Sequence, residues 1–476
     1  MAGRLDHLRI SFQPLELIIL SIILSVASFG RFYQLEEKLV FSTDQGRALL
    51  AARNILQGHL TLVGPETSLT GFHLGPFYYY LTAIPLWLGH WEPLGPALLT
   101  ASFGVATVFL LYWYVKRSWG IASGLVSALA YALSPQAIWQ SRIAIEPSPL
   151  PFFSVLWLIF TTLWLEQKKD RWLGLSLLTI FLAVQLNFSA ISLLGATTFF
   201  VWWEKLPKIS PLWKQRAVIG ALCAVLGLAL GHGFARGITS LGYFWRIWQQ
   251  LTFPSSSVLA LFWFVIFELT VWKLFLAWKK QSLTPTDKAL SLWFLTALLG
   301  FLIKHVSGEH SLALLFPVPA LVLGIGFVKL QTYTRNAYLW ASIPVLLLLM
   351  GFQSARFLES RQPVSIHDHQ KVVEKIIELS QGQPYEFIYR GHLDVYDAAD
   401  DHYQYLLWKA GRQPSTSSRI NTSRQYTEKW LLPTSKTPKM RIYLYSSLTE
   451  AQRYKDLGPF VEVGQVALRS ENITEL

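Results

Sequence analysis

Residues 15–33 read LELIILSIILSVASFGRFY, an apolar run long enough to cross a bilayer. A transmembrane helix needs about 20 predominantly apolar residues. A cleavable signal peptide has a shorter apolar core followed by a small-residue cleavage site. No such site precedes the polar loop that begins near residue 34, so the run is predicted to be a retained first span.

The rest of the 476-residue chain has the same apolar character. It is 52% hydrophobic and 15% charged, with a mean hydropathy of +0.35. Globular proteins carry about 25% charged residues, which excludes an ordinary soluble enzyme. The 20 Trp, 19 Tyr and 30 Phe suit the aromatic belts of a membrane protein. The single cysteine, Cys223, excludes an internal disulfide and a Cys-ligated metal site.

Hydropathy predicts a mainly α, polytopic membrane protein with about eleven spans. The predicted spans are 15–33, 96–115, 120–136, 149–165, 172–187, 189–203, 217–232, 257–278, 289–304, 311–328 and 337–352. Segment 75–90 is brief, aromatic and interrupted by proline, and the positive-inside rule decides its placement. If it does not cross, 16 basic residues lie in the cytoplasmic stretches. We therefore expect a helix in the outer interface, a cytoplasmic N-terminus and an extracytoplasmic C-terminus.

Charge divides the chain near residue 352. Residues 1–352 hold 25 Lys and Arg against 14 Asp and Glu, whereas 353–476 hold 16 against 15. The basic excess lies in the membrane part, which makes nucleic acid a poor partner. We expect a membrane module, 1–352, with an outer loop at 34–95, and a small extracytoplasmic α/β domain, 353–476. Within that domain helices are predicted at 367–380 and 397–410, and strands at 386–390, 440–446 and 461–468.

Four polar clusters lie on the predicted outer face, and the first is Phe41-Ser42-Thr43-Asp44-Gln45-Gly46-Arg47. Helical periodicity begins just after it and stops at Gly58. Asp44 therefore stands at the start of a helix with Arg47 one turn on. Asp44 either caps the helix or acts as a general base, with Arg47 beside it for an anionic ligand.

The second and third clusters follow along the chain. His73 and the tyrosines Tyr78 and Tyr79 flank a Gly-Pro turn, and they form either an interfacial belt or a surface on which a sugar could stack. The third cluster begins where a span ends at Ser134-Pro135, and a short loop then presents Arg142 and Glu146. These two form either an ion pair or an acceptor-binding site.

The fourth cluster, residues 304–310, lies between two spans. His305, Glu309 and His310 could ligate a metal, but their spacing fits no standard motif, and interfacial solvation is the simpler interpretation. A similar choice applies to His367, Asp368 and His369, which suggest a metal pair or, more simply, a helix N-cap. A divalent metal cofactor has no firm support.

These clusters, in this order, resemble the GT-C membrane glycosyltransferases, in the group of protein O-mannosyltransferases and lipid A aminoarabinose transferases. The resemblance covers about residues 15–330. It rests on Asp44/Arg47, on Gly75-Pro76-Phe77-Tyr78-Tyr79, on Ser141-Arg142-Ile143-Ala144-Ile145-Glu146, and on His310 followed by Phe316-Pro317-Val318-Pro319. Three positions depart from the pattern: Gln45 replaces a paired acid, Glu146 a commoner Asp, and Ser311 a Tyr.

The resemblance implies inverting transfer of a sugar, as a hexosyl or pentosyl transferase, from a polyprenyl-phosphate donor to a lipid, protein or envelope polymer. It also implies a bacterial inner membrane. Asp44 and Glu146 are then the expected catalytic residues, with Glu146 orienting the acceptor. The phosphate would meet Arg47, Arg142, Arg236 and Arg246, and the acceptor or sugar would meet His73, Tyr78, Tyr79, His305, Glu309 and His310.

The alternative is a transporter or flippase for a lipid-linked or small-molecule substrate. Such proteins place ionisable residues near the midplane of broken, repeated helices. Here Glu268 and Lys273 are the mid-span exceptions, and no internal repeat is present. A receptor anchored by its spans is a weaker alternative, because eleven spans exceed what an anchor needs.

Overall fold

The computed structural model describes residues 12–65, 73–205, 284–304, 309–333, 337–360, 365–390, 400–417, 437–445, 447, 460–464 and 466–473. Two compact units divide the chain. The helical unit comprises 1–33, 100–141 and 146–360, and the mixed unit comprises 34–99, 142–145 and 361–476. The predicted outer loop thus belongs to the same unit as the C-terminal segment. The expected boundary at 352 lies inside a helix that continues to Glu359.

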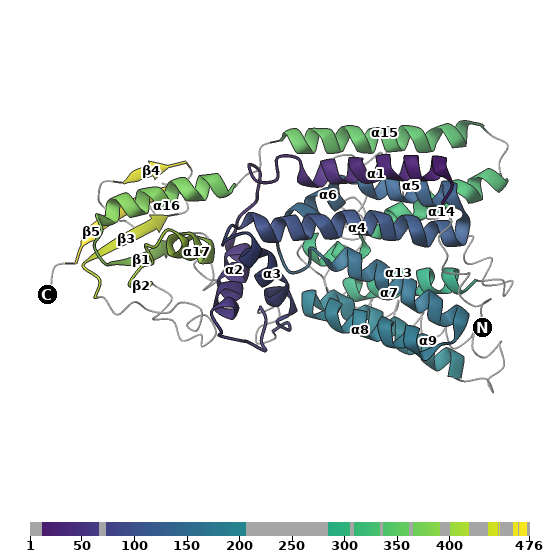
Figure 1. Cartoon of the computed structure of the whole chain (residues 1–476), viewed down its shortest axis with the longest axis horizontal. Helices are drawn as coiled ribbons and strands as arrows, with labels where there is room; N and C mark the ends of the chain where they lie inside the picture. The colour runs from purple at the N-terminus through teal and green to yellow at the C-terminus, as the bar shows by residue number, and fades with distance from the viewer. Residues whose placement is uncertain are drawn as a thin grey trace, which may run out of the picture. The chain divides into compact units, whose positions relative to one another are not determined.

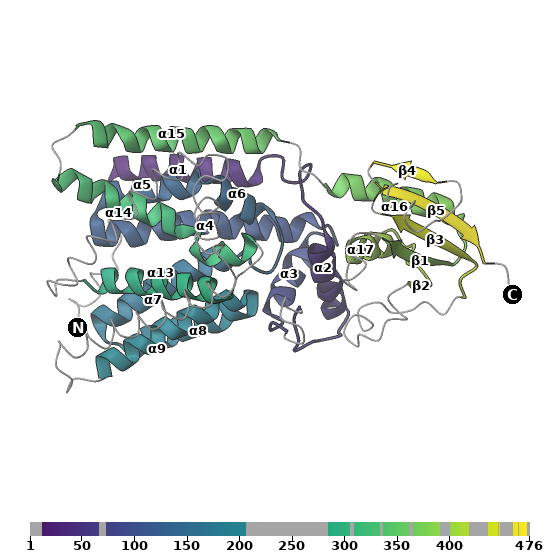
Figure 2. The same cartoon turned by 180° about the vertical axis from the view of Figure 1, so that it is seen from behind.

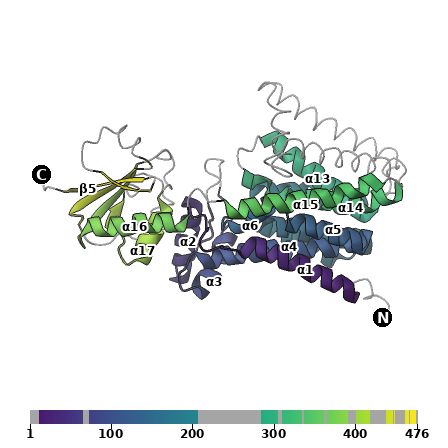
Figure 3. The ribbon, with the colours of Figure 1, turned by 90° about the horizontal axis from the view of Figure 1, so that it is seen from above.

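The helical unit is built from helices that follow the predicted spans. They are α1 (Pro14–Phe32), α4 (Leu94–Trp119), α5 (Ile121–Ala132), α6 (Pro135–Arg142), α7 (Leu150–Gln167), α8 (Asp170–Leu186), α9 (Ile191–Lys205), α13 (Pro285–Lys304), α14 (Pro317–Tyr333) and α15 (Ala337–Glu359), with 3-10 turns η3 (Phe188–Ala190) and η4 (Glu309–Leu315). Helix α7 packs along α8, and α13 packs against α7 and α9 (Figure 1). Figure 3 shows α15 running beside α14.

Three helices among the described residues are long and apolar enough to cross a membrane: α1, α4 and α7. A fourth candidate is the pair α5 and α6, which is bent by 59° at Leu133-Ser134. The predicted spans at 217–232 and 257–278 lie outside the described residues. The mainly helical membrane fold is confirmed, and the number of eleven spans stays a prediction.

Helix α1 shows why these helices require a membrane. Its outward side chains Leu15, Ile18, Ile22 and Phe29 are apolar yet between 58% and 66% exposed. Its opposite face is buried and holds Leu20, Ile23, Ala27 and Gly30, with the charged residues Glu16 and Arg31 near its two ends. A helix whose exposed outer face is apolar along its length is stable where that face meets lipid.

Small residues let the helices of the unit approach closely. A Cβ atom on Gly324 of α14 would lie 2.7 Å from the Ser123 carbonyl oxygen and from the Ser127 Cβ, both on α5. Small residues are favoured at such crossings in membranes, because packing replaces the hydrophobic effect as the driving force. At the end of α4, Gly120 adopts a φ of +90°, which allows α5 to begin directly afterwards.

The mixed unit combines α2 (Thr43–Leu56) and α3 (Phe77–Leu88) with the C-terminal α/β fold. Its five-stranded sheet has the order β2-β1-β3-β5-β4. The strands are β1 (Tyr385–Arg390), β2 (Thr416–Ser417), β3 (Met440–Tyr445), β4 (Val461–Val463) and β5 (Val466–Asn472). Strand β1 is parallel to β2 and β3, whereas β5 is antiparallel to β3 and β4. Helices α16 (Ile366–Ser380) and α17 (Asp401–Lys409) pack against each other.

Most of the predicted α/β elements are present within a few residues of their expected bounds. The segment predicted as one strand at 461–468 is a hairpin instead, because Gly464 at a φ of +63° turns the chain between β4 and β5. The helix expected in 75–90 is α3. It buries Tyr78, Tyr79 and Leu86 and exposes Ile84 and Trp87, which is the amphipathic pattern of an interfacial helix.

Candidate active site around Asp44

Asp44 lies in the first turn of α2. The residue that caps this helix is Ser42, and the Gln45 side chain reaches back to accept a hydrogen bond from the Ser42 backbone nitrogen at 3.0 Å. The exposed Asp44 carboxylate instead accepts a hydrogen bond from Arg47 Nη2 at 2.7 Å. Ser42 and Gln45 thus cap the helix, and the Asp44 carboxylate is exposed. Its role as a general base stays a prediction.

This arrangement also gives Gln45 a role. At the position where the resemblance implies a paired acid, Gln45 is a buried amide that completes a capping box with Ser42. A capping box satisfies backbone N–H groups that the first turn leaves without partners. Gln45 therefore stabilises the start of α2, while Asp44 and Arg47 form the charged pair of this turn.

Helix α17 packs directly on this turn (Figure 1). A Cβ atom on Gly46 would lie 2.2 Å from the backbone nitrogen of His402 and 2.5 Å from the carbonyl carbon of Asp401. Backbone cannot yield as a flexible side chain can, so residue 46 has to be glycine for this approach. Thr43 Oγ1 also contacts His402 Nδ1 at 3.5 Å.

The chain just before Asp44 is held by α16. The Ile366 backbone nitrogen donates to the Leu39 carbonyl oxygen at 3.0 Å, and Val40 forms an antiparallel bridge with Ser365. The buried ring of Phe41 then packs edge-on against His369 and His402. The segment around Asp44 therefore packs against both α16 and α17.

The two histidines form a buried cluster with Tyr403. The His369 and His402 ring centroids are 4.4 Å apart, and Tyr403 lies 4.2 Å from His402. Burial lowers the pKa of His369 to about 4, although a hydrogen bond with the Phe41 backbone opposes this shift. Burial, followed by repulsion from His369, also lowers the pKa of His402 well below its usual value. Both rings are therefore neutral packing groups at neutral pH.

Sequence reasoning considered His367, Asp368 and His369 and missed His402. The N-cap of α16 is Ser365, and Asp368 completes its capping box by accepting hydrogen bonds from Ser365 N and Oγ at 3.2 and 2.9 Å. The three residues therefore lie at a helix start as interpreted, but His369 is buried and not solvated. No periodic signal marks His402, since its role depends on a backbone approach from a distant segment. Three or more His, Cys, Asp or Glu side chains placed to hold a metal do not occur among the described residues.

The second cluster forms a compact turn beside α3. A Cβ on Gly64 would lie 2.1 Å from the Gly75 carbonyl oxygen, so the two loop segments touch at backbone. His73 is half-buried, whereas Tyr78 and Tyr79 are each only 2% exposed. Sugar stacking at these rings stays a prediction.

The third cluster is not the loop that the sequence predicted. Ser134-Pro135 begins helix α6, and Ser134 Oγ accepts a hydrogen bond from the Ala137 nitrogen at 3.3 Å. Proline favours the first turn of a helix, where its missing N–H costs nothing. Arg142 ends α6 and donates to the Gln34 carbonyl oxygen at 3.4 Å. Glu146 is buried in the following turn.

The remaining predicted site residues lie partly outside the described part of the chain. Arg236, Arg246 and His305 lie outside the described residues. Glu309 and His310 begin η4, which leads into α14 at Pro317. Asp44 and Arg142 belong to the mixed unit and Glu146 to the helical unit, so their meeting in one pocket stays a prediction.

Comparison with known proteins identifies the fold. No family model matches the sequence, and no curated protein matches it. The structure is similar to ArnT from Cupriavidus metallidurans in the apo state, with 13% identity, a TM-score of 0.59, and 96% of this chain and 97% of that chain covered. ArnT bound to undecaprenyl phosphate gives 12% identity, a TM-score of 0.57, and 97% and 98% coverage.

A second similar structure is the archaeal oligosaccharyltransferase AglB from Archaeoglobus fulgidus, in complex with an inhibitory peptide and a dolichol-phosphate. It shares 14% identity with a TM-score of 0.51, and the alignment covers 90% of this chain and 69% of that chain. The chain therefore has the fold of ArnT and AglB, and the GT-C fold predicted from the motifs is confirmed.

Proposed function

We propose that this protein is an inverting glycosyltransferase that moves a sugar from a polyprenyl-phosphate donor to an acceptor at the outer face of the membrane. The observation that carries the proposal is the fold. The structural alignment covers nearly the whole length of an ArnT crystallised with undecaprenyl phosphate. A lipid-linked donor needs no nucleotide-binding fold, because its tail stays in the bilayer and its phosphate lies at the interface. No observation on the described residues favours the transport alternative.

Asp44 is the proposed general base. It lies in a helix first turn, where a carboxylate is stabilised by the backbone dipoles, and its exposed position allows contact with an acceptor hydroxyl. The acceptor oxygen attacks the anomeric carbon, the bond from that carbon to the phosphate oxygen breaks, and Asp44 takes the hydroxyl proton. Attack opposite the leaving phosphate inverts the anomeric configuration.

Arginines would neutralise the departing phosphate. Arg47 already has one guanidinium nitrogen on Asp44, and its fork geometry suits a second acceptor such as a phosphate oxygen. Arg142, with Arg236 or Arg246, would complete the phosphate site, and Glu146 would orient the acceptor. His73, Tyr78, Tyr79, His305, Glu309 and His310 are proposed to contact sugar or acceptor.

The proposed placement is a bacterial inner membrane with a cytoplasmic N-terminus. Residues 1–352 would form the membrane module, and the C-terminal α/β domain would be extracytoplasmic and would join the loop 34–95. The contacts of α16 and α17 with the Asp44 motif support this arrangement, because through them the C-terminal domain can position Asp44.

The test compares Asp44→Asn with Glu37→Gln in membranes containing equal amounts of protein. Glu37 is an exposed carboxylate on the same loop, seven residues before Asp44. The assay measures acceptor-dependent release of free polyprenyl phosphate from a radiolabelled donor. We expect Asp44→Asn to lower the rate at least about 100-fold, as removal of a general base does. A near wild-type rate in Asp44→Asn would exclude Asp44 as the base.

A further inference from the structure

A cavity lies in the helical unit where α4 and α7 end and α13 begins. Its volume is about 440 Å³, within the usual range for small-ligand sites. It is lined by Arg117, Ser118, Trp119, Glu166, Thr284, Pro285 and Thr286. The positive-inside rule predicts that this end of the helices is cytoplasmic, whereas the Asp44 site is predicted to face outward. The cavity is thus separate from the proposed transfer chemistry.

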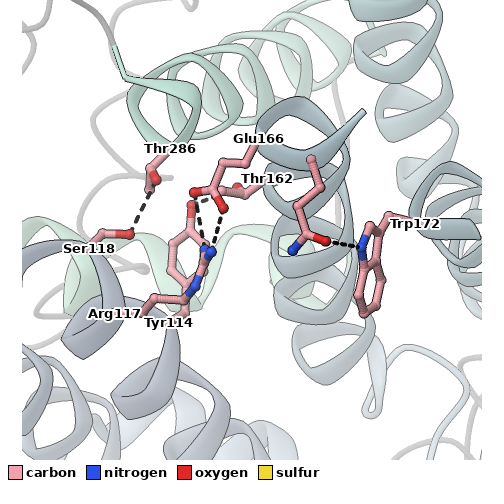
Figure 4. Close-up of polar contacts among 8 residues, drawn as sticks. Tyr114, Arg117, Ser118, Thr162, Glu166, Trp172 and Thr286 are labelled. Carbon is pink, nitrogen blue, oxygen red and sulfur yellow. Dashed lines mark hydrogen bonds and ion pairs between the residues drawn. The ribbon is translucent and has the colours of Figure 1, made fainter. Parts of the chain in front are cut away.

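One wall of the cavity carries a paired cation and anion. Arg117 Nη1 donates to Glu166 Oε1 at 3.1 Å, and Arg117 Nη2 donates to Glu166 Oε2 (Figure 4). The two side chains are 21% and 26% exposed. A guanidinium has five N–H donors, and this pair uses two of them. Arg117 can therefore bind a second anion without leaving Glu166, and the carboxylate keeps lone pairs for a second donor.

The adjoining wall supplies hydroxyl groups. Ser118 Oγ at the end of α4 lies 3.2 Å from Thr286 Oγ1 at the start of α13 (Figure 4). Thr284 caps α13 together with Asp287, whose carboxylate accepts a hydrogen bond from Thr284 Oγ1 at 2.8 Å. Thr284 thus uses its hydroxyl proton on Asp287, whereas Ser118 and Thr286 share one hydrogen bond, so one of their two hydroxyl protons is left for an oxyanion. The N-terminal end of a helix also favours negative charge.

Trp119 adds an aromatic face of fixed orientation. Its ring meets the Tyr114 ring edge-on with the centroids 6.3 Å apart. Tyr114 is itself buried, and its hydroxyl lies 3.2 Å from Thr162 Oγ1 on α7 (Figure 4). An indole held in this way can lie against a cation, because ammonium groups are attracted to the faces of aromatic rings.

The geometry points to a binding site for the headgroup of a zwitterionic membrane phospholipid that carries a phosphate and a primary ammonium, as in phosphoethanolamine. The phosphate oxygens accept hydrogen bonds from Arg117 and from one hydroxyl of the Ser118–Thr286 pair. The ammonium donates to Glu166 and lies near the Trp119 ring. A lipid is the source because the cavity lies at the end of α4, an apolar helix long enough to span the membrane, where headgroups gather.

Alternative headgroups fit this set of groups less well. An anionic glycerol headgroup has no cation to meet the Glu166 carboxylate. A choline headgroup keeps the positive charge but has no N–H, so it cannot donate a hydrogen bond to Glu166. The preference for an ethanolamine headgroup over glycerol and choline headgroups therefore depends on the pairing of Arg117 with Glu166, which places one charge of each sign side by side.

The test measures binding of short-chain dihexanoyl lipids to the purified full-length protein by native mass spectrometry. We expect dihexanoyl phosphatidylethanolamine to bind at least about tenfold more tightly than the phosphatidylcholine or phosphatidylglycerol equivalent, a difference typical of one charged hydrogen bond. The double variant Ser118→Ala/Thr286→Val keeps the ion pair and should weaken ethanolamine-lipid binding about tenfold. Glu166→Gln should abolish the preference over phosphatidylglycerol.

Arg171→Gln is the matched control, because Arg171 is a cation near the same helix ends that stacks on Trp172 and does not line the cavity. It should bind like the wild type. Equal affinity of the wild type for all three lipids would overturn the assignment, and this comparison does not depend on any variant folding. Equal affinity for soluble phosphoethanolamine without acyl chains would overturn the lipid as the source of the ligand.

Discussion

Gly46 and His402 touch through their backbones: a Cβ atom on residue 46 would lie 2.2 Å from the His402 nitrogen. The two residues are 356 positions apart in the chain, yet their contact joins the helix that carries Asp44 to the C-terminal domain. The site motif is therefore built from one segment and positioned by another. That division makes the contact a point at which stability and activity should change together.

Gly46→Ala tests this contact. The added methyl group meets backbone on α17 and forces the helices apart, so we expect a loss of about 3 kcal/mol in the free energy of unfolding, at the upper end for overpacking. Thermal unfolding and proteolysis of the C-terminal domain measure the effect. Gly174→Ala is the control, since a Cβ there meets nothing within 4 Å. If both variants behaved alike, the close approach of α17 would not matter for stability.

Low pH should destabilise the packing of α16 and α17 around the Asp44 motif. The unfolded histidine has a pKa near 6.5, whereas burial lowers the pKa of His369 to about 4 in the folded state. Between these two values the unfolded chain binds more protons than the folded chain, so stability falls as pH falls from about 6.5 toward 4. His369 alone should contribute a loss of up to about 3 kcal/mol, and His402 should add to it.

Unfolding followed between about pH 7.5 and pH 5 measures this dependence. His369→Phe should flatten the profile, because it removes one of the groups that must be neutral. His367→Gln, two residues away and solvent-exposed, should leave the slope unchanged. An unaltered slope in His369→Phe would mean that other groups control the acid response.

Arg47 should affect donor binding more than folding. Arg47→Gln removes a cation beside Asp44, and loss of one charged hydrogen bond to a phosphate corresponds to about 2 kcal/mol. We expect kcat/KM for the polyprenyl-phosphate donor to fall about 30-fold. Lys371→Gln, which neutralises an exposed cation of α16, should leave kcat/KM unaltered. Full activity of Arg47→Gln would remove Arg47 from the proposed phosphate site.

A buried charge cluster should stabilise the packing of α1 against α4. Glu16 on α1 is 3% exposed and accepts hydrogen bonds from Tyr112 and Lys116, both on α4. Glu16→Ala leaves the Lys116 ammonium without this carboxylate and should cost about 3–5 kcal/mol in unfolding free energy.

The double variant Glu16→Leu/Lys116→Leu should cost less than Glu16→Ala, since it removes both charges. A double-mutant cycle measured by unfolding in detergent gives the coupling energy. For comparison, Glu378→Gln breaks the exposed pair between Lys375 and Glu378 and should cost under about 1 kcal/mol. A Glu16→Ala effect as small as this would show that the buried pair adds nothing to stability.

The sequence by itself determined the membrane character, the main helices and the α/β pattern of the C-terminal segment. These depend on local periodicity and composition, which act within one helix or strand and can be read along the chain. It also located Asp44 in the first turn of α2, because helix starts have local signals.

Tertiary structure decided how the parts combine. The helix start at Ser134-Pro135 and the turn at Gly464 have local signals. Sequence patterns did not reveal that residues 34–99 join the C-terminal domain. They did not reveal His402 either, because contact between the backbones of Gly46 and His402 depends on the three-dimensional path of both segments. Such long-range packing leaves no periodic trace in the order of residues, and only the folded chain brings these groups together.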